Sequence, residues 1–180
     1  GRVTKPSFDL TVQALIGIMS RLGEPGQPPI YLGMGSGDAM GGMMAAFGIM
    51  LALYARHTSG VGQFLDASLY GAQLFMAAPT LQAYLATGEQ RYLKQQSRRR
   101  PQNALWNRYQ AADKWLVVCA HDEGDAFARF CDAIGVASLP MDSRFVNADA
   151  RRKNAHALTE ALDKTFRART AAEWTAVLGT

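Results

Sequence analysis

The segment that most restricts the fold is residues 39–55, AMGGMMAAFGIMLALYA, because it contains no charged side chain. A membrane-spanning helix needs about 18 or more apolar residues, and this run falls just short of that length. Small residues and methionines occur around its whole circumference, which is typical of a helix buried inside a protein. Arg56 and His57 follow the run, and cations suit a helix C-terminus. The run therefore predicts a long buried helix and no membrane partner.

The composition bounds the remaining classes of protein. With 48% hydrophobic residues, the chain can form a packed core, which excludes global disorder. The net charge of +4 suits an anionic ligand but is too small to indicate nucleic acid. Cys119 and Cys131 form no Cys-x-x-Cys pair and no disulfide framework, so the cytoplasm is the expected location. Because the chain starts at Gly1 and stops at Thr180, directly after a helical run, we expect a fragment of a longer protein.

Hydrophobic periodicity predicts an α/β fold in which helices dominate and short strands lie between them. Pro79 interrupts one helical run, and Gly135 ends another. Thr170 and Glu173 form a capping box at the start of the last helix. The predicted helices are residues 9–21, where Asp9 is a possible cap, 39–55, 70–87, 127–134, 150–166 and a last one from Thr170; the predicted strands are residues 63–69, 105–111 and 115–120.

A basic segment, residues 88–104, separates a helix-rich part, residues 1–87, from a small α+β part, residues 105–180. The segment has almost nothing to bury, so we interpret it as an exposed linker. Its arginines at positions 98–100 also suit phosphate binding, of nucleic acid or of another phosphate-bearing ligand. No aromatic residue interleaves with these arginines, as base stacking would need, and we therefore favour the solvated linker.

The segment with the most chemical information is residues 28–43, PPIYLGMGSGDAMGGM. The carboxylate of Asp38 stands between glycines where the long apolar helix begins. Glycines let a ligand approach the backbone, and a helix N-terminus offers free N–H groups that stabilise an oxyanion. A plain helix cap is the alternative, although a cap does not need this density of glycine. The glycines fit neither Gly-x-Gly-x-x-Gly, whose third position falls at Asp38, nor a P-loop.

Short motifs occur in a fixed order along the chain. They are residues 6–10 (PSFDL) with 13–17 (QALIG), 23–29 (GEPGQPP), 37–42 (GDAMGG), 56–63 (RHTSGVGQ), 65–69 (LDASL) and 103–118. With these motifs the whole chain resembles the family III CoA-transferases, which include formyl-CoA transferase, carnitine CoA-transferase and the α-methylacyl-CoA racemases. The resemblance implies that residues 1–87 are the C-terminal part of a large nucleotide-binding domain and that residues 105–180 are a truncated small domain.

In this family the aspartate of the Gly-Asp motif is the catalytic nucleophile, and it falls on Asp38. The resemblance implies that Asp38 takes part in moving CoA from an acyl-CoA to a carboxylic acid through an aspartyl anhydride and an aspartyl thioester. Coenzyme A is then a substrate, and no cofactor is expected. The expected substrate and CoA contacts are Gly35, Gly37, Gly41, Gly42, Arg2 and Lys5. The family also implies a homodimer with interlocked subunits.

Two other functions remain open. The racemases of the family pair the motif aspartate with a histidine at the position of Phe8, and racemisation needs two acid–base groups. Phe8 therefore favours a transferase over a racemase. The other alternative is a truncated, non-catalytic nucleotide-binding module that uses the basic segment. His121, Asp122 and Glu123 are adjacent on the chain and would make a poor chelate, so no metal site is expected.

Overall fold

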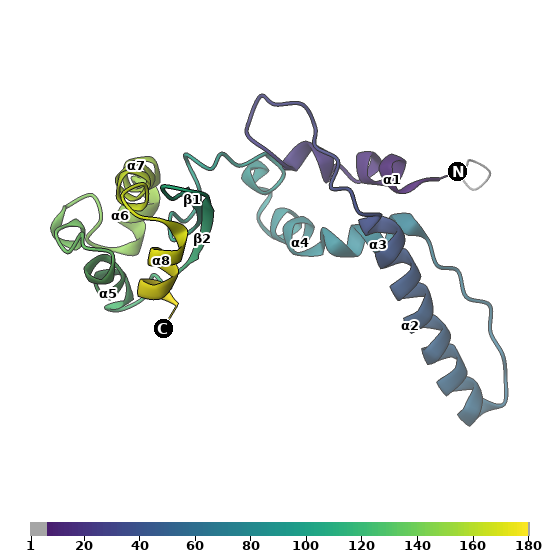
Figure 1. The fold of residues 1–180 in the computed structure, drawn as a ribbon. Coiled ribbons are helices and arrows are strands. Elements are labelled where there is room, and N and C mark those ends of the chain that lie inside the picture. Colours follow the sequence, from purple (N-terminus) through teal and green to yellow (C-terminus); the bar gives the residue numbers. More distant parts are fainter. Residues whose placement is uncertain (1–6, 180) are drawn as a thin grey trace. The chain divides into compact units, whose positions relative to one another are not determined.

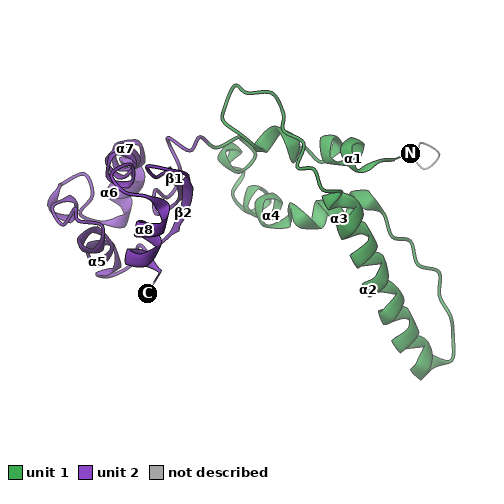
Figure 2. Ribbon diagram, in the orientation of Figure 1, with its two compact units in different colours: residues 1–96 green, residues 97–180 purple. Residues whose placement is uncertain are grey.

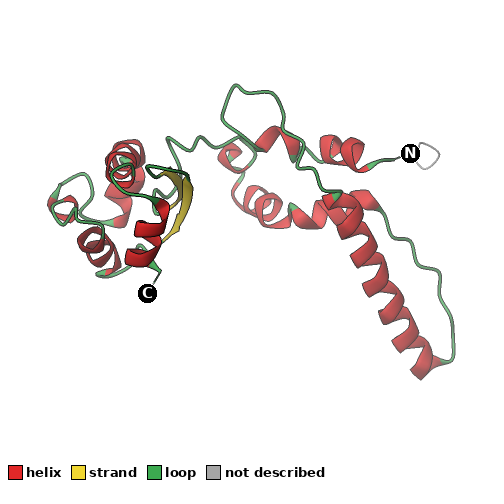
Figure 3. Cartoon of the chain, viewed as in Figure 1, coloured by secondary structure: helices red, strands yellow, loops and turns green. Residues whose placement is uncertain are grey.

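The computed structural model describes residues 7–179 and divides the chain into two compact units (Figure 2). Unit 1 is residues 1–96 and unit 2 is residues 97–180. The predicted mixture of helices and strands is confirmed, and the strands of the described residues lie in unit 2 (Figure 3). Arg2 and Lys5, two of the predicted coenzyme A contacts, lie outside the described residues.

In the described part of unit 1, the regular elements are all helices, joined by long loops (Figure 1). The helix predicted over residues 9–21 ends early, because Gly17 adopts a left-handed φ of 76°. The predicted interruption at Pro79 is confirmed, because α3 ends at Met76 and α4 begins at Ala78 with Pro79 in its first turn. The helices are α1 (Asp9–Leu15), α2 (Ser36–Ser59), α3 (Leu69–Met76) and α4 (Ala78–Thr87), with short 3₁₀ turns at Met19–Arg21 and Gln90–Tyr92.

After α2 the chain returns toward α3 as an extended loop, residues 60–68 (Figure 1). The strand predicted over residues 63–69 is therefore wrong. Its alternating side chains suit a strand, but none of the described residues forms a second strand beside it, and a strand needs a partner for its backbone hydrogen bonds. The loop carries apolar side chains into solvent, including Phe64, which is 92% exposed.

The predicted burial of α2 is wrong for the described chain. Gly37 is its one fully buried residue, while Phe47, Met50 and Tyr54 are exposed. By length and composition alone, α2 is the one described helix that could cross a membrane, and a core helix of a larger protein passes the same test. The apolar pattern identified the helix correctly, but the surface that would cover its outer face is not formed by residues 7–179.

Unit 2 packs helices against a two-stranded antiparallel hairpin, which the sequence predicted. The helix predicted over residues 150–166 is divided at Asn154. The core is aromatic at its centre. The centroid of the Phe166 ring lies 5.0 Å from that of Tyr109 and 5.2 Å from that of Trp174. The elements are β1 (Trp106–Gln110), β2 (Trp115–Cys119), α5 (Ala126–Ala133), α6 (Ala148–Lys153), α7 (Ala155–Phe166) and α8 (Ala171–Leu178), with a 3₁₀ turn at Leu139–Met141.

The boundary between the units falls inside the predicted linker, residues 88–104, and that segment is not simply solvated. On the unit 1 side, the Gln95 side chain donates a hydrogen bond to the backbone oxygen of Leu22. On the unit 2 side, the Arg98 guanidinium forms two hydrogen bonds to Asp163, at 2.9 and 3.0 Å. Composition could not show these anchors, because the partners lie far away in the sequence.

Candidate functional site

The chain enters α2 through three consecutive residues in the left-handed region: Gly33, Met34 and Gly35, with φ of 73°, 57° and 58°. Glycine adopts this conformation freely, whereas a residue with a side chain does so at a cost of roughly 1–3 kcal/mol. Met34 bears that cost and is 94% exposed, so packing of its own side chain offsets little of it. The contacts on either side of this left-handed turn must therefore hold it.

Asp38 is the third residue of α2, and its side chain is exposed. The N-cap of the helix is Gly35, and no side chain caps it. The plain-cap alternative for Asp38 is therefore not what the structure shows. The Asp38 carboxylate lies over Gly35, with Oδ2 3.9 Å from the position that a Cβ atom would occupy there. No hydrogen-bond partner for this carboxylate occurs among residues 7–179, so it is available to a ligand.

The helix N-terminus offers fewer free N–H groups than the sequence suggested. The Ser36 amide donates to the Gly33 oxygen at 3.2 Å, and the Gly37 amide donates to Asp9 Oδ1 at 2.9 Å. The amide of Asp38 itself has no partner within the described part of the chain. Of the first three amides of α2, that of Asp38 alone is therefore unengaged, and the Gly35 amide just before the helix also has no partner within residues 7–179.

Asp9 is the site residue that the sequence analysis considered only as a possible helix cap. Phe8 is the N-cap of α1, and Asp9 follows it with 6% of its surface exposed. The signal was present, since Asp9 belongs to the first motif of the resemblance. Its carboxylate accepts hydrogen bonds from Gln13 Nε2 (3.0 and 3.1 Å), the Tyr31 hydroxyl (2.8 Å), the Gly37 amide (2.9 Å) and Gln73 Nε2 (3.1 Å).

The electrostatics of the site follow from these contacts. Burial raises the pKa of Asp9, but the hydrogen bonds that its carboxylate accepts together bring the pKa below the ordinary value. The pKa of Tyr31 is raised, chiefly because its hydroxyl donates a hydrogen bond to Asp9. Burial and the charges of Asp9 and Asp38 add to this effect. Tyr31 therefore lies within the electrostatic range of both carboxylates, at the exposed edge of the site.

The structure gives the predicted ligand-contact glycines different surroundings. A Cβ atom on Gly37 would collide with Asp9 and with the amide of Gln73. On Gly41 it would come within 2.5 Å of Leu69 Cδ2, so this glycine lets α3 approach α2. Gly42 has nothing within 4 Å of that position, and Gly35 has only Asp38 there. Contact with coenzyme A stays a prediction for all four glycines.

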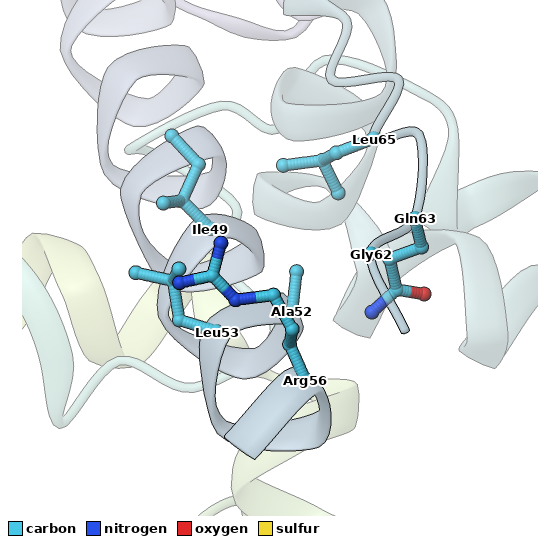
Figure 4. A pocket seen from close by; sticks show the side chains of 7 residues that line it. All are labelled: Ile49, Ala52, Leu53, Arg56, Gly62, Gln63 and Leu65. Carbon is cyan, nitrogen blue, oxygen red and sulfur yellow. The ribbon is translucent and has the colours of Figure 1, made fainter. Parts of the chain in front are cut away.

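Two hollows lie away from Asp38. One, of about 220 Å³, lies between the C-terminal half of α2 and the loop after it, with Ile49, Arg56 and Gln63 in its lining (Figure 4). Ile49 is eleven residues beyond Asp38, or about 17 Å along the helix. The other, in unit 2, is lined by polar residues that include His121, Glu123 and Arg152. Among the described residues, no cluster of three His, Cys, Asp or Glu side chains could hold a metal ion.

Comparison with known proteins assigns the chain to a family. The model of CoA-transferase family III matches residues 2–180. The chain is 36% identical to acetyl-CoA:oxalate CoA-transferase from Acetobacter aceti over 96% of its own length, and 30% identical to succinyl-CoA:mesaconate CoA-transferase from Haloarcula hispanica over 90%. The chain belongs to CoA-transferase family III. It spans 44% and 41% of these two relatives, so it corresponds to less than half of each.

Solved structures agree with this assignment. A CAIB/BAIF family protein from Brucella suis superposes with a TM-score of 0.82 at 26% identity, over 99% of this chain and 47% of that one. A hypothetical protein from Mycobacterium tuberculosis gives 0.80 at 23% identity and shows the fold alone. The mixed helix–strand fold expected from the family resemblance is thereby confirmed.

Proposed function

We propose that the whole protein containing this chain moves coenzyme A from an acyl-CoA to a carboxylic acid, with Asp38 as nucleophile. The observation that carries the proposal is the presentation of Asp38. Its carboxylate is exposed and has no hydrogen-bond partner among residues 7–179. It lies at the start of a 24-residue helix, directly after a strained left-handed turn. Asp38 lies not at the N-cap but in the first turn of the helix, where the positive end of the helix dipole favours the ionised carboxylate that the attack requires.

The proposed reaction starts when the Asp38 carboxylate attacks the thioester carbonyl of the acyl-CoA. The carbon–sulfur bond breaks, which gives a mixed anhydride on Asp38 and the free CoA thiolate. The thiolate then attacks the aspartyl carbonyl, forms an aspartyl-CoA thioester and releases the first acid as its carboxylate. The acceptor carboxylate reverses these two steps and leaves as its own CoA thioester, which restores the Asp38 carboxylate.

Each tetrahedral stage places negative charge on a carbonyl oxygen, and hydrogen-bond donors stabilise that charge. Within the described residues, the amides of Gly35 and Asp38 have no hydrogen-bond partner and are the candidate donors. The relatives transfer CoA to or from oxalate and mesaconate, as their names state. Both are small dicarboxylic acids, which supports a small, polar acid as the acceptor.

A racemase activity is the weaker alternative. α-Methylacyl-CoA racemase from mouse is 28% identical over 92% of this chain. The residue that stands where the racemases have histidine is Phe8, whose side chain is 69% exposed and cannot carry a proton. The interlocked homodimer, the cytoplasmic location and the absence of a nucleic-acid partner remain predictions. The exposed apolar side chains of α2 support a covering surface in the whole protein.

The test traps the intermediate on Asp38. The whole protein is incubated with an acyl-CoA and hydroxylamine, which converts an aspartyl anhydride or thioester into a hydroxamate. We expect peptide mass spectrometry to find the hydroxamate on Asp38, and to find none in the Asp38→Ala variant. A folded protein that binds acyl-CoA and leaves Asp38 unmodified would contradict the mechanism. Label at a different carboxylate would move the nucleophile elsewhere.

A further inference from the structure

A buried polar cluster lies directly beneath the candidate nucleophile. It consists of Asp9, Gln13 and Gln73, which are 6%, 1% and 1% exposed. In the rest of the described unit 1, the buried hydrophobic side chains are Val12 and Ala72. The most buried side chains of this unit therefore form mainly a hydrogen-bond network and not an apolar core. Such networks contribute less to stability than apolar packing does, but they specify one arrangement of the chain.

Asp9 and Gln13 together form hydrogen bonds to the chain on both sides of the left-handed turn. On the N-terminal side, Gln13 Oε1 accepts a hydrogen bond from the Leu32 amide at 3.1 Å. On the C-terminal side, Gln13 Nε2 donates to Ser36 Oγ at 3.1 Å, and Asp9 Oδ1 accepts from the Gly37 amide at 2.9 Å. Residues 33–35, which carry the positive φ angles, stand between these contacts.

The orientation of Gln73 shows how strongly Asp9 determines the cluster. Gln73 Nε2 donates to Asp9 Oδ1 at 3.1 Å, whereas Gln73 Oε1 is buried without a partner among the described residues. Rotating this amide would place its oxygen against the Asp9 carboxylate and lose this hydrogen bond. The orientation that keeps the donor on Asp9 leaves Gln73 Oε1 without a partner among residues 7–179.

Neighbouring side chains fill the space around Gly37. The atoms of Asp9 and Gln73 occupy the space that a side chain on Gly37 would need. Tyr31 closes the exposed side by donating its hydroxyl to Asp9 Oδ2 at 2.8 Å. The peptide before Asp38 is thus held from α1, from α3 and from the segment that leads into the turn.

We propose that Asp9 and Gln13 are positioning residues that clamp the left-handed turn and so present Asp38 to the thioester. This inference rests on the proposed function, because it assigns a purpose to the clamp in the same reaction. Asp9 and Gln13 do not touch the reacting atoms. They act through the Leu32, Ser36 and Gly37 contacts, which fix where the first turn of α2 begins. A misplacement of about 1 Å at a reacting group can cost about 100-fold in rate.

The test compares Asp9→Asn with Asp163→Asn in the whole protein. Both changes are isosteric and remove a hydrogen-bonded carboxylate, but Asp163 pairs with Arg98 in unit 2. In Asp9→Asn we expect the rate of hydroxylamine-trapped label on Asp38 to fall about 100-fold. We expect the KM for acyl-CoA to change less than about threefold, because binding groups elsewhere are untouched. Asp163→Asn is expected to keep the wild-type labelling rate.

A second measurement follows the mobility of the left-handed turn and does not depend on the reaction. Hydrogen exchange followed by mass spectrometry is expected to show faster exchange at residues 32–38 in Asp9→Asn and in Gln13→Leu, with unit 2 unchanged. Slow labelling together with faster exchange at these residues supports the clamp. Wild-type labelling in Asp9→Asn overturns the positioning role and leaves the proposed function intact. A wild-type protein that is never labelled overturns the proposed function, and the positioning role falls with it.

Discussion

The two units of this chain are stabilised in different ways. Unit 2 closes a continuous apolar core in which Leu105, Tyr109 and Phe166 are fully buried. Unit 1 buries a carboxylate and two glutamines at its centre, while large apolar side chains such as Phe47 and Phe64 face solvent. The comparison teaches that the two units bury different kinds of side chain. Unit 2 buries a continuous apolar core, and unit 1 buries a polar network that holds the turn before the candidate nucleophile.

The largest effect is expected when the two units are expressed separately. Residues 97–180 expressed alone are expected to unfold cooperatively on heating, because their apolar core is continuous. Residues 1–96 alone are expected to show no cooperative transition and to aggregate, because their apolar surface is exposed. Circular dichroism and size-exclusion chromatography measure both outcomes. A monomeric, cooperatively melting unit 1 would show that its polar centre is sufficient for folding, and the contrast would be lost.

A core truncation in unit 2 comes next. Phe166→Ala removes the ring between Tyr109 and Trp174 and is expected to lower the free energy of unfolding by about 3–5 kcal/mol. Phe64→Ala, at a side chain that is 92% exposed in unit 1, is expected to stay within about 0.5 kcal/mol. Urea titrations of the whole protein quantify both variants. Equal losses would mean that the Phe64 side chain is covered in the whole protein.

A pair of glycine variants on α2 sharpens the comparison inside unit 1. Gly37→Ala forces a methyl group into Asp9 and Gln73 and is expected to cost about 1–3 kcal/mol. Gly42→Ala meets nothing within 4 Å and is expected to stabilise the helix by up to about 1 kcal/mol. Denaturant titrations with hydrogen exchange at α2 follow both changes. If Gly42→Ala destabilises as much as Gly37→Ala, then a surface outside the described chain contacts Gly42.

The smallest expected effect is a dependence on pH. The folded pKa of Asp9 lies below its unfolded value, so its carboxylate stabilises the fold above the unfolded pKa. This contribution is lost as the pH falls through the folded pKa, which places the change below about pH 4. Hydrogen exchange of residues 32–37 at pH 3 and pH 6, corrected for the intrinsic rate, is expected to show weaker protection at the lower pH. The same dependence in Asp9→Asn would exclude Asp9 as its cause.

Much of the fold could be predicted because its signals are local. The Thr170 capping box, the interruption at Pro79 and the hairpin of unit 2 all depend on neighbours in the sequence, and all are confirmed. The strand over residues 63–69 failed because alternation describes which side chains share a face, and it cannot show whether a partner strand exists. The exposure of α2 could not be predicted either, since an apolar helix carries no information on which part of the chain covers it.

The site was predictable to a similar extent. Asp38 could be singled out because glycine density and a helix start are local patterns. The role of Asp9 depends on Gly37 and Gln73, which lie 28 and 64 residues away in sequence. Spacing alone does not bring such residues together. The engaged Gly37 amide was missed for the same reason, because its acceptor is on a different helix.

The left-handed turn also has a consequence for chirality. Over Gly33, Met34 and Gly35 the backbone has the opposite hand to α2, which begins at the next residue. Glycine is achiral and indifferent to this reversal, whereas an L-residue resists it. In a chemically synthesised chain, a D-residue at position 34 would suit the backbone better than the natural L-methionine does. The turn that precedes the proposed nucleophile thus lies where the backbone is least favourable for L-residues.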